Sequence, residues 1–253
     1  MNDRPSGGWS DEPQRMILAA GISVFLSRRH RFGTDTVLLS RFAQPRAQDR
    51  CVELGAGCGA ATLLWFAEGE PAPARVVCVE LDGEAFGLLG RGVSENGLAG
   101  RITALRADLR CLAKEPDLPA GGFDLVICNP PYFACGEGIE PEDPARRAAR
   151  QEATATIGEV TAAAARLLRF RGRFCCCWKP QRLPDLFEAM RAVRLEPKRL
   201  RPVCTRAGEP PELLLVEAVL GGGKQLNWLP ALVLLGPDGE PGEEYRAIYR
   251  MEE

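Results

Sequence analysis

Residues 51–59 read CVELGAGCG, a short apolar run that ends in a glycine-rich turn. The next residues, as far as Glu68, have helical spacing, so we expect a buried strand, a tight loop and a helix in direct succession. Glycines stand where the backbone must turn sharply and where a ligand must come close to the first turn of the helix. This segment therefore predicts an α/β fold with a ligand site at the start of a helix.

Apolar runs bounded by turn residues recur along the chain and predict buried strands at residues 51–54, 76–81, 102–105, 123–128 and 174–178. Segments with helical spacing lie between or after them, at residues 59–68, 84–96, 153–170 and 186–193. Two further apolar runs follow at residues 212–220 and 229–235. Because strands alternate with helices, we expect a doubly wound, parallel sheet.

The length and composition bound the number of domains. The chain has 253 residues, of which 45% are hydrophobic and 26% charged, and this is enough for one sizeable core. We expect residues 1–45 to form an N-terminal extension of a hairpin and a helix, and residues 46–253 to form the main domain. Neither an internal repeat nor a long linker is evident, so we expect the two to form a single compact unit.

The cysteines indicate a compartment rather than a metal site. Ten cysteines occur, but none has Cys-x-x-Cys spacing and His30 is the only histidine, so we expect no metal. Most cysteines lie in the apolar runs, which indicates buried, reduced thiols and a cytoplasmic location. The apolar run at residues 16–26 is too short to span a bilayer and lacks a signal-peptide cleavage site. We therefore expect a protein that does not bind membranes. We also expect it to be a monomer.

The charge is small overall but uneven. The net charge is −2, whereas residues 166–206 carry twelve Lys or Arg against three acidic residues. Such an excess is typical of a surface that binds phosphates, and equally of solvated helix faces. The pattern leaves both interpretations open.

Carboxylates around the glycine-rich turn indicate which ligand it binds. Gly55, Gly57 and Ala60 also satisfy the dinucleotide pattern, so an NAD site is one interpretation. Glu53 would repel a pyrophosphate but suits a ligand with an ammonium and a sulfonium group, and this favours S-adenosylmethionine. Glu80, at the end of the second strand, is placed to accept both ribose hydroxyls of either ligand.

A third carboxylate, Asp108, follows the third strand of the expected sheet. At that edge it can accept a hydrogen bond from the amino group of the cofactor's adenine. The alternative is an ordinary helix N-cap.

The most specific feature is the segment Asn129-Pro130-Pro131-Tyr132-Phe133 at the end of the fourth strand. An aromatic amino group needs acceptors for its hydrogens when its nitrogen attacks a sulfonium methyl. The side-chain oxygen of Asn129 and the carbonyl of Pro130, fixed by Pro131, provide two. Tyr132 offers a face on which a flipped adenine stacks, and Phe133 forms a wall of the same pocket. This chemistry needs no strong general base, and most of its rate comes from orientation.

The sequence resembles the adenine-N6 methyltransferases with an Asn-Pro-Pro-Tyr loop, and among them the bacterial enzymes that act on the adenosine 3′ of the anticodon of a valine tRNA. Besides that loop, the segments that carry the resemblance are residues 31–39, 149–152, 213–218, 222–224 and 232–234, with Tyr245. The resemblance implies a Rossmann-like class I methyltransferase sheet of seven strands, mostly parallel with the last strand antiparallel. It also implies S-adenosylmethionine as cofactor, tRNA as substrate, and a role for Gly33 and Asp35 in closing over the cofactor.

Two segments concern contacts with RNA. Arg150 follows the catalytic loop and is expected to contact a phosphate beside the flipped base, although an exposed helix start is the alternative, as it is for Arg146 and Arg147. Residues 27–30, Ser-Arg-Arg-His, depart from the family pattern, in which relatives tend to carry a glutamine. We expect His30 to lie on the surface rather than to act in catalysis.

Three other functions remain as alternatives. Protein-glutamine methyltransferases use the same Asn-Pro-Pro-Tyr loop, but they carry a sizeable helical domain before the glycine-rich turn, where this chain has about fifty residues. A methyltransferase acting on the amino groups of ribosomal RNA or DNA is the second, with DNA the less favoured because the chain is acidic. A non-catalytic RNA-binding module is the third, and it need not bind S-adenosylmethionine.

Overall fold

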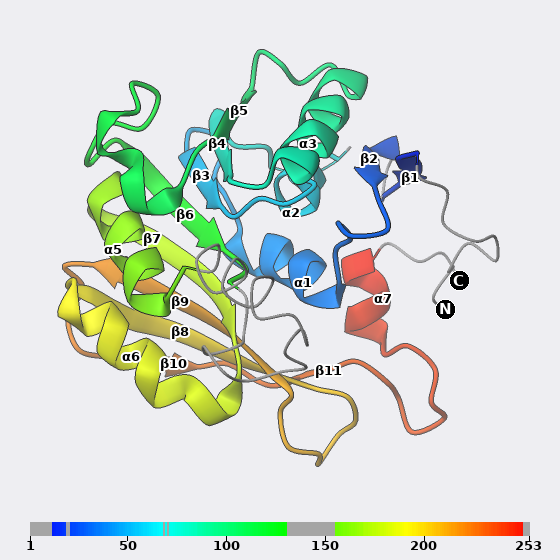
Figure 1. Ribbon diagram of the computed structural model, residues 1–253. Coiled ribbons are helices and arrows are strands. Elements are labelled where there is room, and N and C mark those ends of the chain that lie inside the picture. Colours follow the sequence, from blue (N-terminus) through cyan, green and yellow to red (C-terminus); the bar gives the residue numbers. More distant parts are fainter. Residues whose placement is uncertain (1–11, 19–20, 68, 70, 131–154, 250–253) are drawn as a thin grey trace, which may run out of the picture.

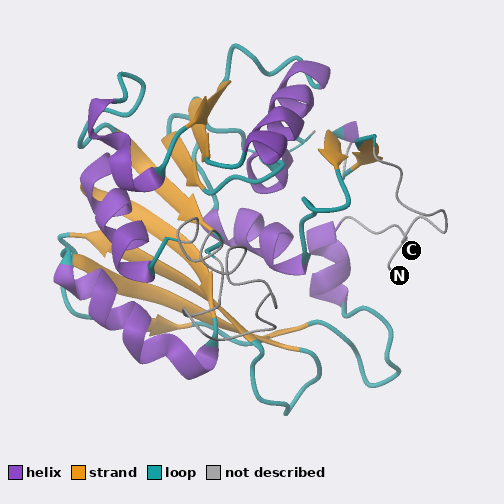
Figure 2. Ribbon diagram, viewed as in Figure 1, coloured by secondary structure: helices purple, strands orange, loops and turns teal. Residues whose placement is uncertain are grey.

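The computed structural model describes residues 12–18, 21–67, 69, 71–130 and 155–249. One sheet runs through the molecule with helices on both of its faces (Figures 1 and 2). Two clusters of buried residues fill the spaces between the layers, one on each face of the sheet. The expected doubly wound α/β fold is therefore confirmed.

Seven strands form the main part of the sheet, in the order β5-β4-β3-β6-β7-β9-β8. Their bounds are β3 Arg50–Leu54, β4 Arg75–Glu80, β5 Ile102–Arg106, β6 Phe123–Cys128, β7 Leu168–Trp178, β8 Leu195–Cys204 and β9 Leu213–Leu220. Only β9 is antiparallel to its neighbours among these seven described strands. Two short strands, β10 Asn227–Trp228 and β11 Leu232–Val233, pair with β8 in parallel. The expected sheet of seven strands with the last one antiparallel is thus confirmed.

The helices cover the two faces unequally. On one face lie α1 Thr34–Ala43, α2 Ala60–Leu64 and α3 Gly83–Glu95, and most of their buried leucines join the first cluster. On the other lie α5 Ile157–Leu167 and α6 Leu183–Ala192 and the short 3-10 helix η2 Leu109–Lys114, with another short turn, η3 Pro180–Arg182, just before α6. The last helix, α7 Glu243–Tyr249, packs beside α1 (Figure 1). Parallel strands with helices on both faces put all their carboxyl ends on one edge of the sheet.

Strand β8 was not expected from the sequence. Its segment carries three cations and two prolines, Pro197 and Pro202, which hide the apolar pattern of the buried residues Leu195, Leu200 and Val203. It lies near the edge of the sheet, with only the two short strands beyond it, and its register with β9 shifts just after Pro197. Prolines are tolerated at such bulges and edges because a ladder hydrogen bond can be given up there.

Two helices are shorter than their sequence patterns indicate. The helix expected over residues 153–170 is described from Ile157 and ends at Leu167, where β7 begins. Its start is fixed by a capping box, in which Thr156 and Glu159 each accept a hydrogen bond from the other's backbone. The helix expected over residues 59–68 is α2, which has only five residues.

The N-terminal strands form a small hairpin that is tied to helix α3. Strands β1 Gln14–Ile17 and β2 Ser23–Leu26 pair antiparallel. The side chain of Asn96, at the end of α3, accepts from the Ser23 amide at 2.9 Å and donates to the Ser23 carbonyl at 2.7 Å. These two bonds satisfy the backbone N–H and C=O of Ser23 and fix β2 to the end of α3.

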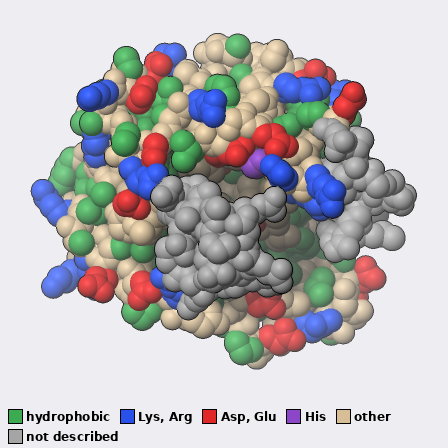
Figure 3. All heavy atoms as spheres, viewed as in Figure 1, with side chains coloured by type: hydrophobic (Ala, Val, Ile, Leu, Met, Phe, Trp, Pro, Cys, Tyr) green, Lys and Arg blue, Asp and Glu red, His purple; other side chains and the backbone are tan. Residues whose placement is uncertain are grey.

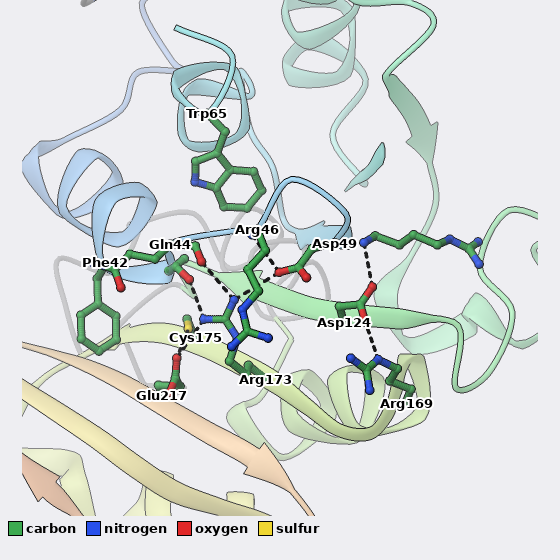
Figure 4. A network of polar contacts seen from close by, with 12 residues as sticks. Phe42, Gln44, Arg46, Asp49, Trp65, Asp124, Arg169, Arg173, Cys175 and Glu217 are labelled. Atoms are coloured by element: carbon green, nitrogen blue, oxygen red, sulfur yellow. Dashed lines mark hydrogen bonds and ion pairs between the residues drawn. The ribbon is translucent and has the colours of Figure 1, made fainter. Parts of the chain in front are cut away.

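A group of buried ion pairs lies at the C-terminal end of α1 (Figure 4). Glu217 of β9 accepts from Arg173 and from Arg199, each at 3.1 Å, and Arg173 also pairs with Asp49 at 3.3 Å. The same two arginines donate to the carbonyls of Phe42, Ala43 and Gln44 at the end of α1. Cations at this position satisfy carbonyls that the helix leaves open.

Eight of the nine described cysteines are buried free thiols, and the ninth, Cys111, is exposed. Burial raises the pKa of the thiols in the strands, for example those of Cys78 and Cys176, which keeps them uncharged. Over the described part of the chain, no helix is long and apolar enough to cross a membrane. Nor do the described His, Cys, Asp and Glu side chains form a group of three or more suited to a metal ion.

Candidate functional site

The carboxyl ends of β3, β4 and β6 bring the glycine-rich loop, Glu80 and Asn129 to one edge of the sheet. Strand β3 lies between β4 and β6, so the loop after β3 has Glu80 on one side and Asn129 on the other. Pro130, which follows Asn129, is described and buried. The other residues expected to contact the substrate or to form the catalytic loop lie outside the described residues: Pro131, Tyr132, Phe133 and Arg150.

The glycine-rich loop needs its glycines. Gly57 has φ +56° and its amide donates to Glu80 Oε2 at 2.7 Å, while a Cβ added to it would meet nothing within 4 Å. Gly59 has φ +81° at the start of α2, and a Cβ there would overlap Cδ1 of Leu89. Both φ values lie in the region that favours glycine. The loop thus presents open space on one side and is closely packed on the other.

Glu80 supports this loop from the neighbouring strand. Its Oε2 accepts from the Gly57 amide at 2.7 Å, and its Oε1 accepts from the Asp82 amide at 2.8 Å. A carboxylate oxygen has two lone pairs, so each oxygen can still accept a ribose hydroxyl. The sequence indicates only the contact of Glu80 with a ligand, whereas in the structure Glu80 also contacts the loop.

Glu53 lies beneath the loop rather than beside solvent. It is buried, and its Oε2 accepts from the hydroxyl of Thr62 at 2.5 Å and from the Thr62 amide at 3.2 Å. Burial raises the pKa of Glu53 to about 7, although the bonds from Thr62 act in the opposite direction. Both bonds from Thr62 use Oε2, so Oε1 is the oxygen that would face a cationic ligand. Thr62 was missed because it lies nine residues away, on the next helix.

Asp108 is the N-cap of η2, as in the alternative interpretation of the sequence. Its side chain accepts from the Arg110 amide at 2.9 Å, at the start of η2, and forms an ion pair with the Arg110 guanidinium at 2.6 Å. The hydrogen bonds from the Arg110 side chain hold the pKa of Asp108 below its ordinary value. Asp108 is therefore charged and partly engaged at the sheet edge after β5.

The start of α1 reaches the end of β6. Gly33 is the N-cap of α1, and Oδ1 of Asp35 accepts from the Thr36 amide at 2.8 Å. The side-chain amide of Asn129 donates through Nδ2 to Oγ1 of Thr36 at 3.2 Å. The structure thus brings the segment upstream of the glycine-rich loop against the proposed catalytic residue, and Thr36 is a contact that sequence reasoning did not identify.

Carboxylates neutralise much of the basic segment at residues 166–206. Seven of its twelve cations form ion pairs with carboxylates: Arg169, Arg173, Arg182, Arg191, Arg199, Arg201 and Arg206. Several of the acidic partners, such as Asp124 and Glu244, come from outside the segment. The excess counted along the sequence is therefore smaller in space, which disfavours one continuous phosphate-binding face.

The segment after β2 presents a different group of charges. The hydroxyl of Ser27 accepts from the amides of Arg29 and His30, and His30 Nε2 lies 3.2 Å from Asp82 Oδ1. Arg28 and Arg29 are exposed on this turn. Figure 3 shows the histidine with acidic side chains on one side and basic side chains on the other, at the margin of a hollow.

Comparison with known proteins identifies the same architecture. Residues 15–186 match the model of the family described as "Methyltransferase small domain". The chain is 28% identical over 219 residues to proteins named tRNA1(Val) (adenine(37)-N6)-methyltransferase from Cronobacter sakazakii and Escherichia coli, covering 86% of each chain.

Solved structures agree on the fold. A predicted O-methyltransferase, Atu636 from Agrobacterium tumefaciens, superposes with a TM-score of 0.67 at 22% identity, covering 86% of this chain and 96% of that one. P. horikoshii TYW2 in complex with MeSAdo superposes with a TM-score of 0.56 at 16% identity, covering 84% and 73%. The family match covers more than half of the sequence and includes the glycine-rich loop and Asn129, so the dinucleotide alternative is set aside: the chain belongs to the methyltransferase small domain family.

Proposed function

We propose that this protein transfers a methyl group from S-adenosylmethionine to the N6 amino group of an adenosine in tRNA, namely the adenosine 3′ of the anticodon of a valine tRNA. The observation that carries the proposal is the position of Asn129 at the end of β6, beside the glycine-rich loop that ends β3. The names of the relatives, which share 28% identity over 86% of the chain, support the choice of substrate.

The described residues fit S-adenosylmethionine by shape and by charge. The Cβ positions of Gly55 and Gly57 face open space, so the backbone leaves room for a ligand. Glu53 lies near the end of β3, Glu80 ends β4 and Asp108 follows β5, so the three carboxylates belong to neighbouring strands at this edge of the sheet. They suit the cofactor's ammonium, ribose hydroxyls and adenine amino group respectively. Gly33 and Asp35, at the start of α1, are proposed to close over the cofactor. When bound, S-adenosylmethionine supplies a methyl group that its sulfonium activates.

Asn129 provides the acceptor that the adenine amino group needs. Its Oδ1 accepts one amino hydrogen, and the carbonyl of Pro130 accepts the other, so the lone pair on N6 is turned toward the methyl group. No general base is assigned, because the nitrogen becomes strongly acidic only after it has been methylated and then loses its proton to water. Tyr132 and Phe133, held by Pro131, are proposed to stack with the flipped base, and Arg150 to contact a phosphate.

The tRNA is proposed to lie across the same edge of the sheet, with the protein acting as a cytoplasmic monomer. Arg28 and Arg29 are exposed there on a turn that Ser27 and His30 hold in place, which suits contacts with phosphates. We propose that residues 1–45 serve as an extension of the main domain at residues 46–253 rather than as a separate domain.

Purified protein, S-adenosylmethionine and a transcript of a valine tRNA test the proposal directly, with modified nucleosides measured by mass spectrometry. We expect N6-methyladenosine at the position 3′ of the anticodon. Asn129→Ala should remove most of the methyl transfer, about 100-fold or more, as loss of a preorganised transition-state contact does. Its affinity for S-adenosylmethionine, measured by calorimetry, should change little.

Asn227→Ala is the matched control, because Asn227 is an exposed asparagine on the short strand β10. It should leave turnover unchanged. Methylation of a glutamine-containing peptide or of ribosomal RNA, with none of the tRNA, would refute the proposed substrate. Tight RNA binding without any affinity for S-adenosylmethionine would refute the catalytic function itself.

A further inference from the structure

We propose that Thr36, with its hydroxyl held by Asp35, is a positioning residue that sets the orientation of the Asn129 side-chain amide. The inference rests on the proposed function, because it concerns the atom that accepts the amino hydrogen of adenine. Thr36 and Asn129 are 93 residues apart in the sequence and belong to α1 and to the end of β6.

Three side chains form a short chain of hydrogen bonds. Nδ2 of Asn129 lies 3.2 Å from Oγ1 of Thr36, and Oγ1 of Thr36 lies 3.5 Å from Oδ1 of Asp35. The same Asp35 oxygen accepts from the Thr36 amide at 2.8 Å, and that amide also lies 3.1 Å from the carbonyl of Gly33. The first turn of α1 therefore fixes both the backbone and the side chain of Thr36.

The direction of these bonds follows from the number of protons available. The hydroxyl of Thr36 has a single proton, and it donates this proton to Oδ1 of Asp35. Toward Asn129 the hydroxyl oxygen can then act only as an acceptor. The group of Asn129 that faces it must be a donor, which is Nδ2 rather than Oδ1.

This direction decides which end of the amide serves the reaction. Nδ2 and Oδ1 lie on opposite sides of Cγ, so an amide that points Nδ2 at Thr36 turns Oδ1 away from it. Oδ1 is the atom that the proposed mechanism needs for the amino hydrogen of adenine. A reversed amide would present N–H donors to the N–H donors of the substrate, and such a contact repels rather than stabilises.

Thr36→Val tests the proposal, because valine keeps the shape of threonine and removes the acceptor. We expect kcat on tRNA to fall about tenfold, with KM for tRNA and the affinity for S-adenosylmethionine nearly unchanged, because the lost contact acts in the transition state. Thr36→Ser keeps the hydroxyl and should restore most of kcat. Thr103→Val, a half-buried threonine of β5, is the matched control and should leave kcat unchanged.

Coupling between the two residues separates orientation from general damage. In single-turnover reactions, Thr36→Val should lower the rate far less in the Asn129→Ala background than in the wild type, because there is no amide left to orient. Equal losses in both backgrounds would overturn the proposal.

Nuclear magnetic resonance gives a readout that needs no activity. The side-chain NH₂ signals of Asn129, identified by their loss in Asn129→Ala, should shift in Thr36→Val but not in Thr36→Ser or Thr103→Val. A wild-type protein that methylates no RNA refutes the proposed function, while these signals still test the orientation. An active wild type with an equally active Thr36→Val variant refutes the inference alone.

Discussion

At the scale of single residues, the buried carboxyl group of Glu53 makes the stability of the fold depend on pH. Burial raises its pKa from an ordinary 4.5 to about 7. The unfolded chain therefore releases this proton at a lower pH than the folded chain does. Folding stability falls as the pH rises from 4.5 to 7, and the loss is complete above 7.

Glu53→Gln should remove this dependence, because glutamine stays neutral and its oxygen can still accept from Thr62. Between pH 5 and pH 8 we expect the wild type to lose about 2 to 3 kcal/mol relative to the variant, at 1.36 kcal/mol per pKa unit. Urea unfolding followed by circular dichroism at the two pH values measures the difference. Parallel pH profiles for the two proteins would contradict this assignment of the pKa.

The residues expected at the site differ in how well the sequence could identify them. Glycines and Asn129 were identified because their roles follow from local geometry and from a strand end. Thr36 and Thr62 act through partners that are 93 and nine residues away, and a threonine in a helix carries no pattern that indicates such a contact. The second role of Glu80, which holds the Gly57 amide, was missed for the same reason.

At the scale of elements, substitution of two glycines of one loop is expected to affect different properties, ligand affinity for Gly57 and stability for Gly59. Gly57→Ala places a methyl group in the open space above the loop, so it should lower the affinity for S-adenosylmethionine at least about tenfold, whereas the strained φ costs only about 1–2 kcal/mol of stability. Gly59→Ala adds an overlap with the buried side chain of Leu89 to the same strain. It should cost about 3 kcal/mol or more.

Calorimetric titration and urea unfolding of both variants separate the two effects. For Gly59→Ala, the affinity of the molecules that remain folded should stay close to that of the wild type. If both variants lose affinity equally, with equal stability, the loop has no distinct ligand side and packing side.

The strands were predictable where the apolar runs were uninterrupted, and less so where polar residues or prolines interrupted them. Strands β3 to β6 and the core of β7 follow directly from their apolar residues. Strand β8 does not, because three cations and two prolines interrupt its apolar pattern, and the register shift after Pro197 breaks its alternation. The number of strands and the reversed direction of β9 came from the family resemblance, since apolar patterning carries no information on strand direction.

At the scale of the whole molecule, the ion pairs of Glu217 join β9, β7 and β8 beneath α1 (Figure 4). Glu217→Ala would leave the guanidinium groups of Arg173 and Arg199 largely buried without their shared carboxylate. We expect a loss of about 3 kcal/mol, as is typical when one partner of a buried pair is removed. Urea unfolding at neutral pH measures it.

Glu244→Ala is the control, because it removes an ion pair with Arg201 in which the glutamate is half exposed. Such a pair contributes less than about 1 kcal/mol. Similar losses in the two variants would show that burial does not set the importance of these pairs.

Helix α1 connects this buried charge to the chemistry at the opposite edge of the sheet. Its last carbonyls are held by Arg173 and Arg199, and its first turn carries Thr36 against Asn129. Ten residues span about 15 Å, so a tilt of about 4° at the anchored end moves the other end by about 1 Å. A displacement of that size is enough to cost a reaction about 100-fold in rate. Substitutions near Arg173 that stabilise the fold would therefore also change the position of the Asn129 side-chain amide. Thermostable variants of this protein should be selected on turnover as well as on melting temperature.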